Sequence, residues 1–242
     1  MALAGLACGA VNALAGGGSL ILFPALLATG MGPLAANVTN SVSTWPGYLG
    51  SSAGFRDELA SQRHRLPRLG AATLAGSIVG CVLLLITPAG AFDVIVPVLV
   101  LLAALLLAVQ PRITRWVGEP VEHHPRARRL QLGAVFAASI YGGYFGAALG
   151  VIFLGVLALT IAEPLRRLNG LKAGLSVIDS TVSLVVFGLF GPVHWAAVAI
   201  AAPAALLGGY VGARGARRVD DQVLRVGVVV FAVAVAIYLA LT

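Results

Sequence analysis

Two charged side chains stand inside a long apolar stretch, where they could bind or carry other charges. Lys172 and Asp179 are the only Lys, Arg, Asp or Glu residues between Arg167 and Arg214. A charge inside a membrane helix costs about 3 kcal/mol on insertion scales, so such residues are functional candidates. An ammonium group can hold an anion, and a deeply placed carboxyl group can take up and release a proton. The alternatives are that Lys172 extends to the membrane surface and that Asp179 is a hydrogen-bonded structural acid.

Polar side chains also follow one face of each of two predicted helices, at steps of three and four residues. In the segment 34–55 they are Asn37, Asn40, Thr44, Tyr48 and Ser51. In the segment 169–190 they are Asn169, Lys172, Ser176, Ser180 and Ser183. One interpretation is that both faces line a shared hydrated site. The other is that these residues join helices by hydrogen bonds, worth about 1 kcal/mol each.

A run of glycines provides a third candidate for anion binding. Gly16, Gly17 and Gly18 are consecutive, and three glycines in a row should interrupt a helix. The backbone N–H groups of 16–19, Ser19 included, would then stand free at the start of a half-helix, whose positive end favours an anion. The alternative is a tight turn or a close helix contact.

The composition places these residues in a membrane protein. Apolar residues make up 59% of the 242 residues and charged residues 10%, and the mean hydropathy is +0.97. Charged residues make up about a quarter of a typical soluble domain. This chain has far fewer, so lipid must surround much of it. We therefore expect an all-α, polytopic fold. The expected helical elements are 1–29 (broken at the glycines), 34–55, 69–88, 92–110, 131–161 (broken near Gly150), 169–190, 195–213 and 224–241.

An internal repeat divides the chain. At an offset of 132 residues, four glycine or asparagine positions coincide without a gap: Gly18 with Gly150, Asn37 with Asn169, Gly76 with Gly208, and Gly80 with Gly212. We therefore expect two tandem repeats, 1–110 and 131–242, joined by a basic linker, 111–130. The glycine pairs one helical turn apart are expected to let helices approach closely.

The basic residues suggest how the repeats are oriented. They form clusters at 56–68, 112–129, 166–172 and 214–225. If all eight elements cross the membrane, the clusters divide between the two sides. If 1–29 and 131–161 are re-entrant hairpins instead, each repeat crosses three times and all four clusters face the cytoplasm, as the positive-inside rule favours. We prefer this second arrangement, in which the repeats are inverted and broken helices meet at the midplane.

Other function classes find little support. The net charge of +7 comes from short segments between apolar runs, which argues for topology rather than nucleic-acid binding. The residues around His123 and His124 are expected to form a solvated loop, so no metal site and no cofactor are expected. An intramembrane enzyme needs a nucleophile–base pair or clustered acids, and Asp179 is the only acid well inside an apolar element. We expect a transporter and no enzyme; a structural or accessory membrane protein is the alternative.

Three segments resemble the TauE/SafE sulfite exporter family, also called the TSUP permeases, over nearly the whole chain. They are GLACGAVNALAGGGSLILFPAL (5–26), GGYFGAALGVIFLGVL (142–157) and GGYVGARGARR (208–218). The glycines and the proline that carry over are Gly16, Gly17, Gly18, Pro24, Gly146, Gly150, Gly208 and Gly212. The second repeat departs from the pattern, with Ala148-Leu149-Gly150 in place of three glycines and Gly155 in place of the proline. The resemblance implies transport of sulfite, thiosulfate or sulfonate-type anions.

The resulting hypothesis is a secondary transporter in the bacterial inner membrane that exports a small anion. The backbone amides of 16–19 and the ammonium group of Lys172 would contact the anion, and Asn37, Asn40, Asn169 and Ser176 would line the site. Asp179 would couple protons, with the membrane potential or a proton gradient as the driving force. The expected partners are the anion and the lipid bilayer, without nucleic acid. The sequence leaves the oligomeric state open, including a homo-oligomer.

Overall fold

The computed structural model of the chain describes residues 1–116, 125–215, 226, 228–230 and 233–234. None of these residues forms a β-strand. The helices are α1 (Ala2–Leu14), α2 (Ser19–Leu27), α3 (Pro33–Gly54), α4 (Arg56–Gln62), α5 (Leu66–Ile86), α6 (Ala89–Trp116), α7 (Pro125–Tyr144), α8 (Leu149–Thr160), α9 (Leu165–Phe190) and α10 (Trp195–Gly215). The expected element 224–241 lies largely outside the described residues.

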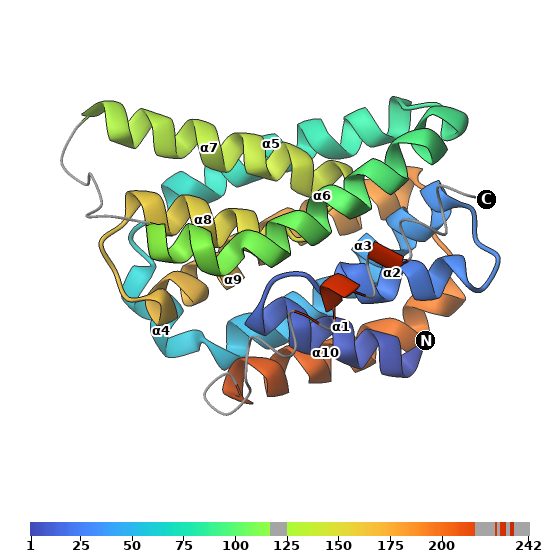
Figure 1. Cartoon of the computed structure of the whole chain (residues 1–242), viewed down its shortest axis with the longest axis horizontal. Helices are drawn as coiled ribbons and strands as arrows, with labels where there is room; N and C mark the ends of the chain where they lie inside the picture. Colours follow the sequence, from blue (N-terminus) through green and yellow to red (C-terminus); the bar gives the residue numbers. More distant parts are fainter. Residues whose placement is uncertain (117–124, 216–225, 227, 231–232, 235–242) are drawn as a thin grey trace.

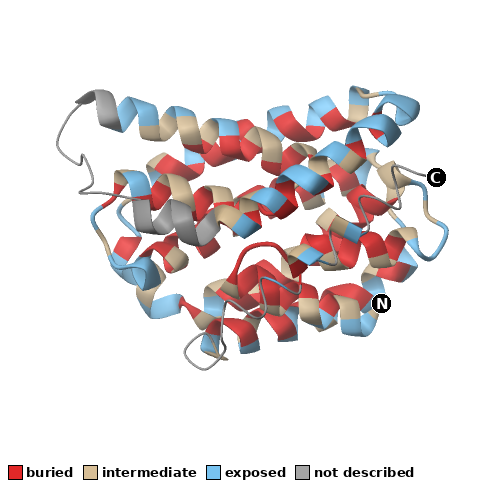
Figure 2. Ribbon diagram, in the orientation of Figure 1, coloured by how far each residue is buried: buried red, intermediate tan, exposed pale blue. Residues whose placement is uncertain are grey.

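Four of the described helices are long and apolar enough to cross a membrane: α5, the part of α6 from Ala89 to Val109, α9 and α10. Their outward sides carry large apolar residues such as Val94, Leu105 and Leu207, each at least 59% exposed, and Figure 2 shows the buried residues on the inward sides of the ribbons. Such helices face lipid outside and the protein core inside. The chain is therefore a polytopic α-helical membrane protein, as its composition predicts.

Two differences from the expected elements concern the polar segments. Residues 56–68 lie between the expected helical elements as a polar connection, yet they contain the short helix α4, which packs on the start of α9. A Cβ at Gly170 of α9 would lie 2.7 Å from the backbone nitrogen of Leu59 in α4. The second difference is that α7 begins at Pro125, inside the expected linker. Tertiary contacts stabilise helices that are too short to be stable alone, which explains α4.

Glycine contacts reveal the directions of the helices. Along α1 and α10, Gly5 faces Ala201 and Gly9 faces Ala205, so these two helices run in parallel. A second set of contacts shows that α5 and α7 are parallel: Gly76 faces Phe136 and Gly80 faces Ile140. A third set shows that α3 and α9 are antiparallel: Val38 lies at Gly191, which follows the end of α9, and Trp45 bonds to Thr181. The helices α3 and α9, which stand at corresponding places in the two expected repeats, therefore run in opposite directions.

The broken elements form two hairpins (Figure 1). The helices α1 and α2 begin and end toward the end of the molecule where the N-terminus lies, whereas α7 and α8 begin and end toward the opposite end. The open end of the second hairpin is joined by a hydrogen bond of 2.8 Å from Gln131 Nε2 to Thr160 Oγ1. At 1.5 Å per residue, the 13 residues of α1 span about 20 Å, which is too short for the hydrocarbon layer of about 30 Å.

The first break is held by a side chain of α1. The backbone N–H of Gly18 donates a hydrogen bond of 2.8 Å to Asn12 Oδ1. Asn12 is buried, and its amide nitrogen lies 3.6 Å from the sulfur of Cys8. A Cβ at Gly18 would clash with the carbonyl oxygen of Cys8. The chain therefore folds back here so that the start of α2 packs directly on α1. Position 18 must be glycine because a side chain there would not fit between the two helices.

The second break lies between Tyr144 and Leu149, slightly before the expected position at Gly150. Gly146 has a φ of +75° and Ala148 a φ of +61°. Ala148 stands 132 positions after Gly16, which has a φ of +83°, so both breaks use the left-handed region at the same repeat position. Alanine adopts that conformation at a cost of about 1–2 kcal/mol. The hydroxyl of Tyr141 supports this turn by donating a 2.7 Å hydrogen bond to the carbonyl of Ala147.

We predict that Asn12→Ala lowers the stability of the folded protein. The Gly18 N–H would lose its acceptor in a buried position, which costs about 1–3 kcal/mol. The measurement is the thermal unfolding midpoint of the purified protein in detergent. Ser139→Ala is the matched control, because Ser139 is also fully buried and donates only to Val135, within its own helix. Equal unfolding midpoints for the two variants would show that Asn12 does not hold the break.

Candidate functional site

The two breaks touch at the centre of the molecule. A Cβ added to Gly16 would lie 2.8 Å from the Cα atom of Gly150, and a Cβ added to Gly150 would lie 2.8 Å from the Cα atom of Gly16. Only glycine at both positions allows this contact. The role of Gly150, which lies inside α8, is therefore to receive Gly16, while Gly146 and Ala148 make the turn.

Each half of the chain also caps the broken helix of the other half. The ammonium group of Lys172 in α9 donates a hydrogen bond of 3.2 Å to the carbonyl of Ala13, near the end of α1. The side-chain amide of Asn37 in α3 donates a hydrogen bond of 3.0 Å to the carbonyl of Tyr144, the last residue of α7. The last carbonyls of a helix lack partners within the helix and carry partial negative charge. These two contacts therefore stabilise helix ends that lie far from water.

Lys172 does not extend to the surface of the structure. Its side chain is 2% exposed, and its Cδ atom lies 3.5 Å from the Cβ position of Gly150. The cation is thus placed between the end of α1 and the start of α8, beside both breaks. This position places the amine of Lys172 at the end of α1 and its side chain at the first turn of α8.

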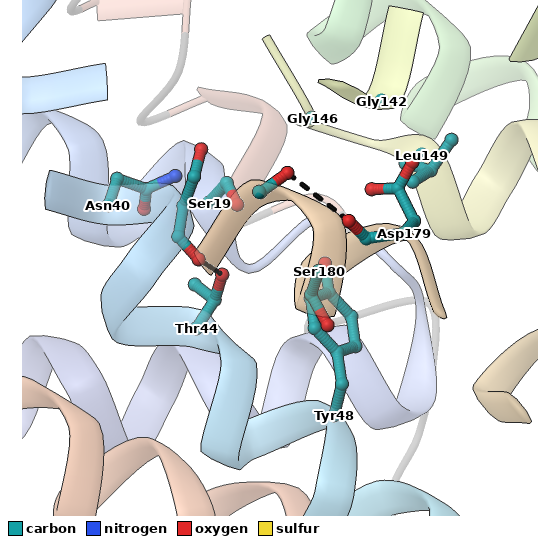
Figure 3. Close-up of a pocket in the computed structure, with 11 residues that line it drawn as sticks. Ser19, Asn40, Thr44, Tyr48, Gly142, Gly146, Leu149, Asp179 and Ser180 are labelled. Atoms are coloured by element: carbon teal, nitrogen blue, oxygen red, sulfur yellow. Dashed lines mark hydrogen bonds between the residues drawn. The ribbon is translucent and has the colours of Figure 1, made fainter. Parts of the chain in front are cut away.

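The polar faces of α3 and α9 meet in a pocket next to the breaks (Figure 3). Its lining is drawn from both halves of the chain: Ser19, Asn40, Ser41, Thr44, Tyr48, Gly142, Gly146, Leu149, Asp179, Ser180 and Ser183. In this structure the pocket is small, with room for about one water molecule. In Figure 3, Asn40 and Thr44 lie on one helix and Asp179 and Ser180 on the other.

The predicted site residues divide between the pocket and its surroundings. Ser19, Asn40 and Asp179 line the pocket. Outside the lining are Gly16, Gly17, Gly18, Asn37, Asn169, Lys172 and Ser176. Among these, Gly16 and Lys172 belong to the contacts that join the breaks. A Cβ at Gly17 would point at Leu107 of α6, 2.8 Å from its Cδ2 atom, so this glycine faces α6.

Several polar groups near the pocket have no partner among the described residues. They include the side-chain oxygens of Asn37, Asn40 and Asn169, and the backbone N–H groups of Gly17 and Ser19 at the start of α2. Asn40 and Ser19 are nearly fully buried and line the pocket. Buried polar groups are nearly always hydrogen-bonded in folded proteins, so this part of the pocket has unused capacity for a polar solute.

Asp179 is the acid of the pocket. The hydroxyl of Ser77 in α5 donates a hydrogen bond of 2.5 Å to Asp179 Oδ1. A Cβ at Gly142 in α7 would lie 2.6 Å from the same oxygen, so this glycine makes room for the carboxyl group. The sequence analysis missed Ser77, Gly142 and Asn12. Asn12 could have been found from the sequence, because it is the one strongly polar residue in α1. Ser77 could not, because a single serine in an apolar helix is not distinctive.

Comparison with known proteins agrees with this architecture. A family model described as "Sulfite exporter TauE/SafE" matches residues 1–239. The "Probable membrane transporter protein YfcA" of Escherichia coli (strain K12) is 28% identical over 213 residues, covering 85% of this chain and 76% of its own length. The "Probable membrane transporter protein ORF9" of Sinorhizobium sp is 28% identical over 238 residues, covering 96% and 87%. No solved structure shows a significant match.

These findings establish the protein class. The relatives are bacterial membrane transporters by name, and the described helices include four that can cross a membrane. The chain is therefore a multi-pass membrane transporter and not an enzyme, and the bacterial inner membrane is the compartment that these findings support. Since the family model covers almost every residue, the chain belongs to the TauE/SafE sulfite exporter family.

Proposed function

We propose that this protein is a secondary transporter that exports small sulfur-containing anions of the sulfite, thiosulfate or sulfonate type. The observation that carries the proposal is the pocket between α3 and α9, which residues of both halves line beside the two helix breaks, and in which the side-chain oxygen of Asn40 has no partner among the described residues. The antiparallel directions of α3 and α9 support the further proposal that the two halves are inverted repeats around this pocket.

The chemistry around the pocket suits an oxyanion. Oxyanions accept several hydrogen bonds, and the free N–H groups of Gly17 and Ser19 stand at the positive end of α2. The buried ammonium group of Lys172 adds a full positive charge next to the breaks. An anion that reaches the breaks could replace the carbonyl of Ala13 as the acceptor of Lys172, and the carbonyl of Tyr144 as the acceptor of Asn37.

The driving force follows from charge and from the acid in the pocket. The membrane potential is worth about 2.3 kcal/mol per elementary charge per 100 mV, and a negative interior favours the exit of an anion. Asp179 would couple protons to this movement, because its carboxyl group lines the pocket and is buried between α5, α7 and α9. No nucleotide is needed in this scheme.

Lys172→Gln tests the cationic contact. Glutamine can still donate a hydrogen bond to the carbonyl of Ala13 but carries no charge. Hydrogen bonds to charged groups contribute about 1.5–3 kcal/mol, so we expect the KM for sulfite to rise by about tenfold or more, with Lys172→Arg recovering part of it. The measurement is the flux of radiolabelled sulfite, thiosulfate and methanesulfonate into and out of proteoliposomes. If Lys172→Gln keeps the wild-type KM, Lys172 caps α1 only. If the wild type moves none of the three anions, the proposed substrate class is wrong.

Asp179→Asn tests proton coupling. Asparagine keeps the size of the side chain and an oxygen that can accept the Ser77 hydroxyl, but it cannot titrate. We expect this variant to exchange labelled anion across the membrane and to lose accumulation driven by a pH gradient. Asp93→Asn is the matched control, because Asp93 is an exposed acid on α6, away from the pocket lining. Full gradient-driven accumulation in Asp179→Asn would show that Asp179 is a structural acid.

A further inference from the structure

We propose that Phe55 and Phe187 are the two gate residues of this transporter, because each ends one of the polar helix faces, at opposite ends of the pocket. The proposal rests on the proposed transport function and names residues that it does not include. The two phenylalanines stand 132 positions apart, the offset of the internal repeat. Their side chains are 5% and 0% exposed, respectively.

Both residues continue the polar faces by one helical step. Phe55 directly follows the end of α3 and comes four positions after Ser51, and in α9 Phe187 comes four positions after Ser183. Residues four apart lie on the same side of a helix, one above the other. Each polar face therefore leads from the pocket to a phenylalanine that is turned toward the interior of the protein and away from lipid.

The antiparallel packing of α3 and α9 places the two phenylalanines at opposite ends. Phe55 lies at the junction of α3 and α4, where Leu59 contacts the start of α9. Phe187 lies at the other end, where Gly191 contacts Val38 near the start of α3. The pocket lies between these ends, since its lining includes the middle residues of both helices.

The surroundings of the two side chains correspond as well. Phe55 forms a small apolar cluster with three alanines, Ala13, Ala173 and Ala213, from α1, α9 and α10. Phe187 belongs to the main core together with Phe145 and Cys81. These two residues stand at the repeat positions of Ala13 and Ala213. At these two repeat positions the cluster of Phe55 has alanines, where the larger core that holds Phe187 has Phe145 and Cys81.

A hydrophobic constriction blocks ions by excluding water, which is the effect of a buried phenylalanine at the end of a polar path. Phe55 is also placed where movement is possible. Its backbone (φ −102°, ψ 24°) lies outside the helical region between α3 and α4, and hinges are often found at the ends of elements. Helix α4 is tied to the start of α9 by the ion pair of Glu58 with Arg166.

The carboxyl group of Glu163 forms a second tie at this end. Hydrogen bonds from Arg167 and from Gln62 of α4 lower the pKa of Glu163, so this carboxylate stays charged at neutral pH. Together the two contacts hold α4 against the start of α9 and the connection before it. They also hold the junction between α3 and α4 that carries Phe55. For the pocket to open at this end, these contacts would have to break as the side chain of Phe55 moves aside.

The test is the side from which water-soluble reagents reach the pocket. A reporter cysteine replaces Thr44, which lines the pocket, in a background with Cys8→Ala and Cys81→Ala. An anionic, membrane-impermeant methanethiosulfonate reagent is added to inside-out or right-side-out vesicles. Removing most of a buried phenylalanine side chain should increase the fraction of molecules that are open at that end by about tenfold or more.

We expect Phe55→Ala to accelerate labelling from the side of α4 and Phe187→Ala to accelerate it from the opposite side, with the larger effect for Phe55→Ala.

Two controls keep the test decisive. Phe153→Ala removes an equally buried phenylalanine of α8 that lies outside both polar faces, and it should leave both labelling rates unchanged. Phe55→Leu keeps an apolar plug and should label at nearly the original rate. Acceleration from the same side in both alanine variants, or no acceleration beyond Phe153→Ala, would overturn the proposal. Labelling needs no substrate, so the flux of labelled anions through the wild type tests the proposed function separately.

Discussion

The buried ends of two broken helices are the constraint on which the rest of this structure depends. In a medium without water, the last carbonyls of α1 and α7 need partners inside the protein. The chain supplies them across its two halves: Lys172 serves α1, and Asn37 serves α7. Gly16 and Gly150 bring the two breaks into contact, so that each half completes the other. The halves therefore cannot fold separately into the same arrangement.

The same constraint concentrates polar groups at one place. Helices α3 and α9 bring the capping side chains to the breaks, and the remaining polar residues of both faces then surround the pocket. This accounts for the weak hydropathy of α3, which is surrounded by α1, α9 and α10 and is not among the four apolar spans. Transport by such a protein needs the pocket to open alternately to each side, and an arrangement with equivalent ends provides two related ways to do so.

The sequence predicts the helices and the two polar faces well, because hydropathy and periodicity are local properties. It does not predict α4, whose stability comes from packing on α9. The second break was expected near Gly150 because glycine usually marks such breaks, whereas Ala148 carries the left-handed conformation under strain. The partners of Asn12 and Asp179 could not be predicted, since Ser77 lies 102 positions before Asp179 and a single serine in an apolar helix has no distinctive pattern. The double role of Lys172, a candidate anion contact that also caps α1, depends on a contact between distant segments.

The central claim is that the two broken elements enter the membrane from opposite sides and return to the side from which they came. Its most direct test is labelling of single cysteines at the four hairpin ends, Ala2, Ala28, Leu130 and Ala162, in a background with Cys8→Ala and Cys81→Ala. With an impermeant maleimide in intact cells, we expect Ala2→Cys and Ala28→Cys to react from outside, and Leu130→Cys and Ala162→Cys to react only after the membrane is opened. Labelling of Ala2→Cys and Ala28→Cys from opposite sides would show that the first element spans the membrane, and would contradict this account.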